Sequence, residues 1–189
     1  APKSDMACHE DAAKALDIAE CLERLRSSTI LLIGKKGGAQ AIYDEFGVKT
    51  QTADFAELHE AYLNADPQAA LQTAERWIAD AETIVEPSPE DIRKSAAMAL
   101  AMNALMEKHN AQAISIHCLG GFYSGQLQAY PCLGFVDLND EGRVGACEGD
   151  LASTVTMLAI GLLAGRPGFI SDPVIDTARN RIIYAHCVA

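Results

Sequence analysis

The feature that most constrains the fold is an alternation of short apolar runs with segments of helical periodicity. The run from Thr29 to Ile33 is followed by Gly34 and is typical of a strand buried on both faces of a parallel sheet. Further strands are expected over 48–52, 83–85 and 113–116, separated by helices over 55–63, 67–81 and 89–109. Strands alternating with helices of this length indicate βαβ units. The sequence therefore predicts an α/β fold: a Rossmann-like three-layer domain with a mostly parallel sheet.

The flanking segments are assigned by the same criteria. A first helix is expected over about 10–26 and a short one ending at Gly47. After His117 we expect a loop over 118–121, then strands over 134–138 and 143–147. A buried helix follows from its N-cap Asp150 to Ala164, and Gly165 and Pro167 end it. Beyond it, two extended pieces are expected over 169–172 and 181–186, with a turn near Asn180.

Charge and composition exclude several classes of function. The 189 residues carry 26 acidic and 15 basic side chains, a net charge of -11, so neither nucleic acid nor an anionic membrane surface is an expected partner. The longest apolar run, around 157–164, is far shorter than the roughly 20 residues of a membrane-spanning helix. The six cysteines form no CxxC pair, which favours reduced thiols and a cytoplasmic protein.

The sequence gives little support to a nucleotide-binding loop and only weak support to a catalytic thiol. The segment from Gly34 to Gly38 follows a strand, yet its glycines have neither the GxGxxG nor the GxxxxGK[ST] spacing of nucleotide-binding loops. Cys118, beside His117, and Cys147 are possible nucleophiles of a thiol enzyme, but a buried cysteine is commonly a small apolar side chain.

The most informative stretch runs from Ala146 to Asp150 and places two carboxylates at a strand-to-helix junction. In open parallel sheets, ligands bind at the carboxyl ends of the strands. Asp150 has a ready explanation as a helix cap, whereas Glu148 has none. Asp172 and His186 follow, also near the ends of expected strands. A Glu, an Asp and a His from three segments suit Mn²⁺ or a similar divalent ion, which makes a metal centre a hypothesis to test.

A series of motifs in the second half resembles the L-fucose isomerase-like group of aldose–ketose isomerases and the related L-arabinose isomerases. The series contains, in order, Pro131-Cys132-Leu133, Ala146-Cys147-Glu148-Gly149-Asp150, Thr156-Met157-Leu158, Gly165-x-Pro167-x-Phe169, Asp172 and His186-Cys187. The first half is compatible with the middle α/β domain of that group through the segments 43–47, 55–58 and 91–102. The specific part of the resemblance begins at Cys147.

The resemblance implies a domain organisation. Residues 1–165 would be the second Rossmann-like domain of the family, and residues 166–189 the beginning of its C-terminal β-rich domain. The chain would then be a fragment of a longer polypeptide, and by itself we expect it to be inactive. Family members are homo-oligomers, so self-association is expected as well.

The resemblance also implies a reaction and a site. Glu148 and Asp172 would bind Mn²⁺ or another divalent metal and share the proton transfer that interconverts an aldose and a ketose through an enediol. His186 matches a metal-binding histidine of the arabinose isomerases. The substrate would be a small sugar. Two other hypotheses stay open, a non-catalytic α/β domain for sugar binding or assembly, and a thiol enzyme that uses Cys118 or Cys147.

Overall fold

The computed structural model describes residues 18–34 and 37–186, and its centre is a four-stranded parallel sheet in the order β2-β1-β3-β4. The strands are β1 (Thr29–Ile33), β2 (Lys49–Ala53), β3 (Ala113–Ile116) and β4 (Val144–Ala146). Every residue of β1 and β3 is buried, as their largely apolar sequences predict, whereas the edge strand β2 is partly exposed.

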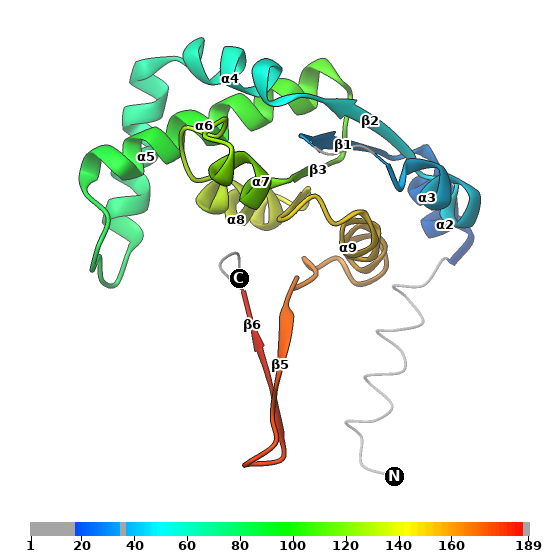
Figure 1. Ribbon diagram of the computed structural model, residues 1–189. Coiled ribbons are helices and arrows are strands. Elements are labelled where there is room, and N and C mark those ends of the chain that lie inside the picture. The colour runs from blue at the N-terminus through cyan, green and yellow to red at the C-terminus, as the bar shows by residue number, and fades with distance from the viewer. Residues whose placement is uncertain (1–17, 35–36, 187–189) are drawn as a thin grey trace, which may run out of the picture.

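Helices cover both faces of the sheet (Figure 1). One face carries α2 (Ile18–Ser27), α3 (Ala39–Phe46) and α9 (Leu151–Ala164). The other carries α6 (Pro89–Lys108) and α8 (Cys132–Asp140), with α4 (Phe55–Leu63) and α5 (Pro67–Asp80) packed on α6. The short α7 (Cys118–Tyr123) follows β3 directly. This arrangement confirms the expected Rossmann-like α/β fold class.

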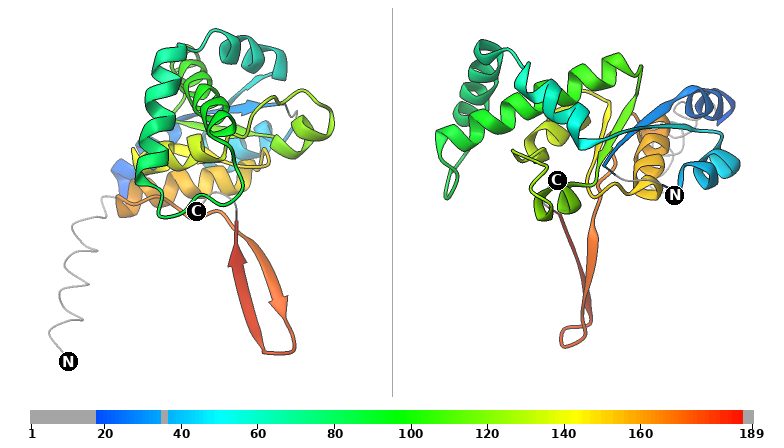
Figure 2. Two further views of the ribbon diagram at one scale, coloured as in Figure 1. Left: turned by 90° about the vertical axis from the view of Figure 1, so that its left-hand side faces the viewer. Right: turned by 45° about the horizontal axis from the view of Figure 1, so that its top comes forward.

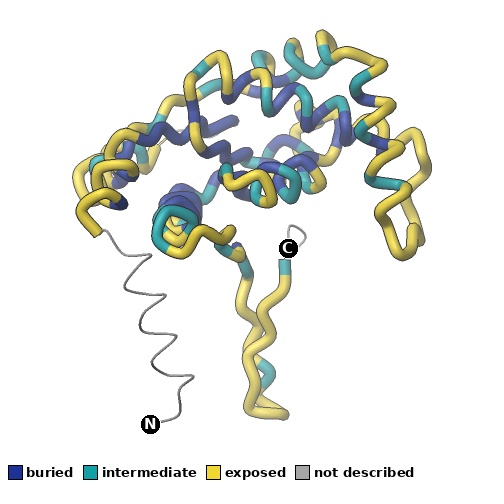
Figure 3. Tube along the Cα trace, turned by 180° about the vertical axis from the view of Figure 1, so that it is seen from behind, coloured by how far each residue is buried: buried dark blue, intermediate teal, exposed yellow. Residues whose placement is uncertain are grey.

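The core lies between the sheet and these helices (Figure 3). Close approach depends on small residues, because Gly134 of α8 packs on Ala99 of α6 and Gly145 of β4 packs under Phe135 of α8. A smaller apolar cluster joins α5 to α6 and contains Ala70, Ala74, Ile92 and Ala96. In the part of the chain that the structure describes, no helix has the length and apolarity needed to cross a membrane.

Beyond α9 the chain forms a separate antiparallel hairpin of β5 (Asp172–Asp176) and β6 (Arg181–Ala185). The hairpin extends away from the layered domain in every view (Figure 2). Its apolar side chains are largely exposed, Val174 at 55% and Ile175 at 72%. A two-stranded ribbon of this kind is marginally stable alone. That it begins a β-rich domain at residue 166 stays a prediction.

Most of the expected elements are confirmed, including the caps at Asp54 and Asp150 and the proline at the start of α5. Other predictions were wrong. Residues 134–138 form part of α8 and not a strand, because Gly134, Phe135 and Leu138 are the residues that a helix buries on one face.

Four further predictions differ from the structure. Residues 83–85 are not a strand but lie in the fully exposed connection between α5 and α6, away from the sheet. The loop expected at 118–121 is part of the helix α7. The strand expected to end at Asp172 begins there. The helix α9 is not buried on all sides, because Ile160 is 40% exposed. The part of the first helix expected before residue 18 lies outside the described residues.

Candidate metal centre

Glu148 lies where the chain leaves β4 at the carboxyl edge of the sheet. Its φ angle of 65° and that of Gly149, 63°, place both residues in the left-handed region. Glycine adopts this conformation at little cost, but for a glutamate it is uncommon and must be held by its surroundings. Asp150 then caps α9, accepting hydrogen bonds from the Ser153 N–H at 3.0 Å and the Ser153 hydroxyl at 2.6 Å. The two neighbouring carboxylates thus have different roles, as the sequence indicated.

The hairpin supplies the other two predicted ligands. Asp172 begins β5 and pairs with Ala185, the last residue of β6, so that His186 follows directly beside it. The potential ligand atoms of Glu148, Asp172 and His186 all lie within 4.8 Å of one another. Within the described residues, these three form the one group of three or more His, Cys, Asp or Glu side chains with such spacing. The structure therefore brings together the three residues that the sequence singled out from separate segments.

The donor set of this cluster fits a divalent cation. Protein oxygen and nitrogen ligands at about 2.1 Å from an ion lie about 3 Å apart when adjacent and about 4.2 Å apart when opposite. A spacing of at most 4.8 Å reaches this range with small side-chain rotations. Two carboxylates with one imidazole suit Mn²⁺ and similar ions of borderline hardness. Glu148 and His186 are half-buried and Asp172 is exposed, so the cluster is accessible to a ligand.

Residues 117 and 118, which directly follow β3, surround Glu148. The His117 Nδ1 atom is 3.4 Å from the Glu148 carbonyl oxygen. The Cys118 and Cys147 sulfurs are 3.0 Å apart. The Cys147 thiol, helped by the backbone N–H groups of Glu148 and Leu119, lowers the pKa of Cys118 to about 6 against the opposing effect of burial.

The thiol-enzyme hypothesis requires an accessible sulfur. Cys118 is 4% exposed and Cys147 is 2% exposed, so a substrate would reach neither thiol without movement of the protein. Their position beside Glu148 gives the two cysteines a packing role at the carboxyl edge of the sheet.

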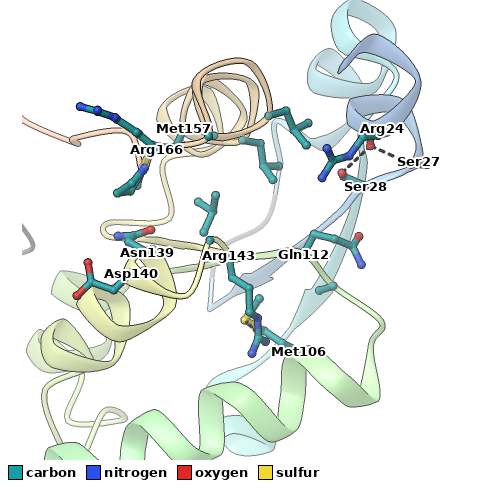
Figure 4. Close-up of a pocket in the computed structure, with 18 of the residues that line it drawn as sticks. Arg24, Ser27, Ser28, Met106, Gln112, Asn139, Asp140, Arg143, Met157 and Arg166 are labelled. Carbon is teal, nitrogen blue, oxygen red and sulfur yellow. Dashed lines mark hydrogen bonds between the residues drawn. The ribbon is translucent and has the colours of Figure 1, made fainter. Parts of the chain in front are cut away.

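A cavity of about 870 Å³ lies at the opposite edge of the sheet (Figure 4). Ser28, Gln112 and Arg143, which precede β1, β3 and β4, line it. Arg24, Arg143 and Arg166 also border it, in or just after the final turns of α2, α8 and α9. The carbonyl ends of helices attract cations, which explains these arginines without a ligand.

A smaller cavity of about 430 Å³ lies at the same edge as Glu148, beyond the ends of β1 and β2. Gly34, Asp54, Phe55 and Gln126 are among the residues that line it. Because ligands of open parallel sheets bind at the carboxyl edge, this cavity is the better placed of the two for a site that includes Glu148.

Fold and cluster together define an α/β protein with a candidate divalent-metal site at the carboxyl edge of its sheet. No family model matches the chain. The chain is 21% identical over 196 residues to two proteins named sulfoquinovose isomerase, from Priestia aryabhattai and from Priestia megaterium (strain ATCC 12872 / QMB1551). Each match covers 98% of this chain and 43% of the relative. The chain is thus similar to sugar isomerases and spans less than half of their length.

Proposed function

We propose that the full-length protein is a metal-dependent aldose–ketose isomerase and that Glu148, Asp172 and His186 bind its divalent cation. The observation that carries the proposal is the convergence of these three side chains, from the segment after β4, the start of β5 and the residue after β6, to within 4.8 Å. The similarity to proteins named sulfoquinovose isomerase supports sugar isomerisation as the class of reaction.

The reaction moves one proton between C1 and C2 of an open-chain sugar. A bound divalent cation would withdraw electron density from the oxygens on C1 and C2 and so acidify the C–H bond. The two carboxylates then divide the proton transfers between them. One removes the proton from C2 of the aldose, the C–H electron pair forms the C1=C2 double bond, and the carbonyl oxygen on C1 takes up a proton to give the enediol. The O2 hydroxyl then loses its proton to form the C2 carbonyl, and a proton is delivered to C1. Glu148 and Asp172 lie close enough to take these roles on one bound sugar.

The histidine and the surrounding protein have supporting roles in this proposal. His186, as a neutral nitrogen ligand, would complete the set without adding a third negative charge. The half-buried position of Glu148 limits the access of water, which strengthens its interaction with a cation. Substrate contacts from the rest of the polypeptide would complete the site, so we expect the isolated 189-residue chain to be a poor enzyme. Self-association and a cytoplasmic location stay predictions.

The test is an isomerase assay on the full-length protein, first stripped of metal and then supplied with Mn²⁺. The panel would contain aldopentoses, aldohexoses, 6-deoxy sugars and sulfoquinovose, with formation of the ketose as the measurement. Metal-dependent ketose formation that Glu148→Gln abolishes and the exposed control Glu141→Gln preserves is the expected result. A folded, Mn²⁺-loaded protein that converts none of these sugars would favour the non-catalytic sugar-binding alternative.

A further inference from the structure

The backbone of Glu148 requires an explanation of its own. A non-glycine residue in the left-handed region persists only where neighbouring groups hold it there. Two such groups lie beside Glu148. The Glu148 carbonyl oxygen lies 3.4 Å from His117 Nδ1, and the Cys118 sulfur lies 3.0 Å from the sulfur of Cys147, the residue before Glu148. The two residues that follow β3 therefore contact the turn that Cys147 and Glu148 form after β4.

His117 is itself fixed from three directions. Its backbone N–H donates to the Ile33 carbonyl of β1 at 3.0 Å, and its carbonyl accepts from the Gly121 N–H at 3.0 Å. The imidazole edge rests on Gly120, where an added Cβ would come within 2.3 Å of Cδ2 and 2.4 Å of Nε2. A ring packed in this way has little freedom to turn away from Glu148.

We propose that His117 is a positioning residue for Glu148: its Nδ1–H donates to the Glu148 carbonyl and holds the left-handed turn that directs this side chain to the cluster with Asp172 and His186. This inference rests on the proposed metal-binding function. The direction of donation follows from the acceptor, since a carbonyl oxygen accepts only from a protonated Nδ1. Groups that orient a ligand without contacting the metal commonly change metal affinity by about 10–100-fold when they are replaced.

Two variants separate hydrogen bonding from packing. His117→Asn places an amide N–H near the position of Nδ1, whereas His117→Gln places one near the position of Nε2. Titration of the full-length, metal-free protein with Mn²⁺, followed by electron paramagnetic resonance, gives the affinity of each variant. We expect His117→Gln to weaken Mn²⁺ binding by at least about tenfold, and His117→Asn to stay within about threefold of the wild type. Wild-type affinity in a folded His117→Gln protein, or equal losses in both variants, would overturn the proposal.

A second measurement does not depend on metal. Selective ¹⁵N-histidine labelling of the metal-free protein reports which ring nitrogen of His117 carries the proton. The proposal requires a protonated Nδ1, and a neutral ring protonated only on Nε2 would refute it. The variant Glu148→Gln distinguishes a failure of the proposed metal site from a failure of the His117 proposal. If Mn²⁺ affinity is unchanged in that variant, the metal site is wrong, and the His117 contact is then decided by the nitrogen spectrum alone.

Discussion

Asp172 and His186 meet at the open end of one hairpin, because Asp172 pairs with Ala185 across the ribbon and His186 is the next residue. The pairing register thus fixes the distance between two of the three candidate ligands. The third, Glu148, follows β4 of the other sheet. A metal ion at this point would join the hairpin to the layered domain.

Asp172→Asn should weaken Mn²⁺ binding by at least about tenfold, since it removes a negative charge from the cluster. The matched control is Asp176→Asn, at the other end of the same strand. Asp176 accepts hydrogen bonds from the Ala178 and Arg179 N–H groups and lies outside the cluster. Calorimetric titration of both variants with Mn²⁺ measures the effect. Equal affinities in the two variants would contradict the assignment of Asp172.

Mn²⁺ should raise the thermal unfolding midpoint of the full-length protein, and treatment with a chelator should reverse the rise. A ligand at about 100 times its dissociation constant stabilises the folded state by about 2.7 kcal/mol. Glu148→Gln should lose most of this shift, because one of the two charged ligands becomes neutral. Differential scanning calorimetry with and without Mn²⁺ checks the prediction, and a full shift in the variant would count against it.

Glu57 should contribute a pH-dependent part of the stability. Its carboxylate accepts hydrogen bonds from Lys108 Nζ at 2.9 Å and lies 2.8 Å from His109 Nε2, and these contacts lower its pKa below the ordinary 4.5. The unfolded chain therefore takes up the proton first as the pH falls. The contribution is complete above about pH 4.5 and is lost as the pH falls through the lower folded pKa.

Glu57→Gln should remove this contribution, about 1 kcal/mol or less for a partly exposed group, and flatten the acid side of the stability curve. Urea unfolding at a series of pH values measures the change. The exposed Glu86→Gln is the control and should keep the wild-type slope. An unchanged slope in Glu57→Gln would show that the contacts with Lys108 and His109 do not affect folding.

Gly145→Ala should destabilise the fold by about 1–3 kcal/mol, because its new Cβ would lie 2.7 Å from the Phe135 Cα atom, which cannot move alone. Gly161→Ala provides the comparison. Its Cβ would meet nothing closer than 3.9 Å, and a glycine within a helix is less favourable than alanine by about 1 kcal/mol. Chemical denaturation should therefore show opposite signs for the two variants. Similar effects would mean that α8 and β4 can separate easily.

The parts of the fold that follow from local sequence were predictable. The apolar runs of β1 and β3 are buried when both faces of the sheet are covered by helices. The caps at Asp54 and Asp150 are hydrogen bonds to backbone groups three residues away in the sequence. The short apolar run in α8 is compatible with the periodicity of a helix and with that of a strand. Its packing partners include Ala99 of α6, which is distant in the sequence, and Gly145 of β4. Those tertiary contacts favour the helix, and no local pattern contains them.

The three candidate metal ligands were predictable from the sequence, but the neighbouring residue that positions Glu148 was not. Glu148, Asp172 and His186 are the ligand types that a divalent ion requires, at positions where strands begin or end. In the sequence, His117 is notable only as the neighbour of Cys118. Its contact with the Glu148 carbonyl depends on β3 and β4 being adjacent and in register, which sequence spacing alone does not show.

The hairpin geometry allows its outer residues to change in sequence and length without moving the two ligands. Both hairpin ligands lie at the root of the ribbon, and the turn near Asn180 lies at its far end. Tilting a ribbon about its root displaces the tip most and the ligands least. The outer residues can therefore lengthen, shorten or change to suit a neighbouring surface while the spacing of Asp172 and His186 is preserved.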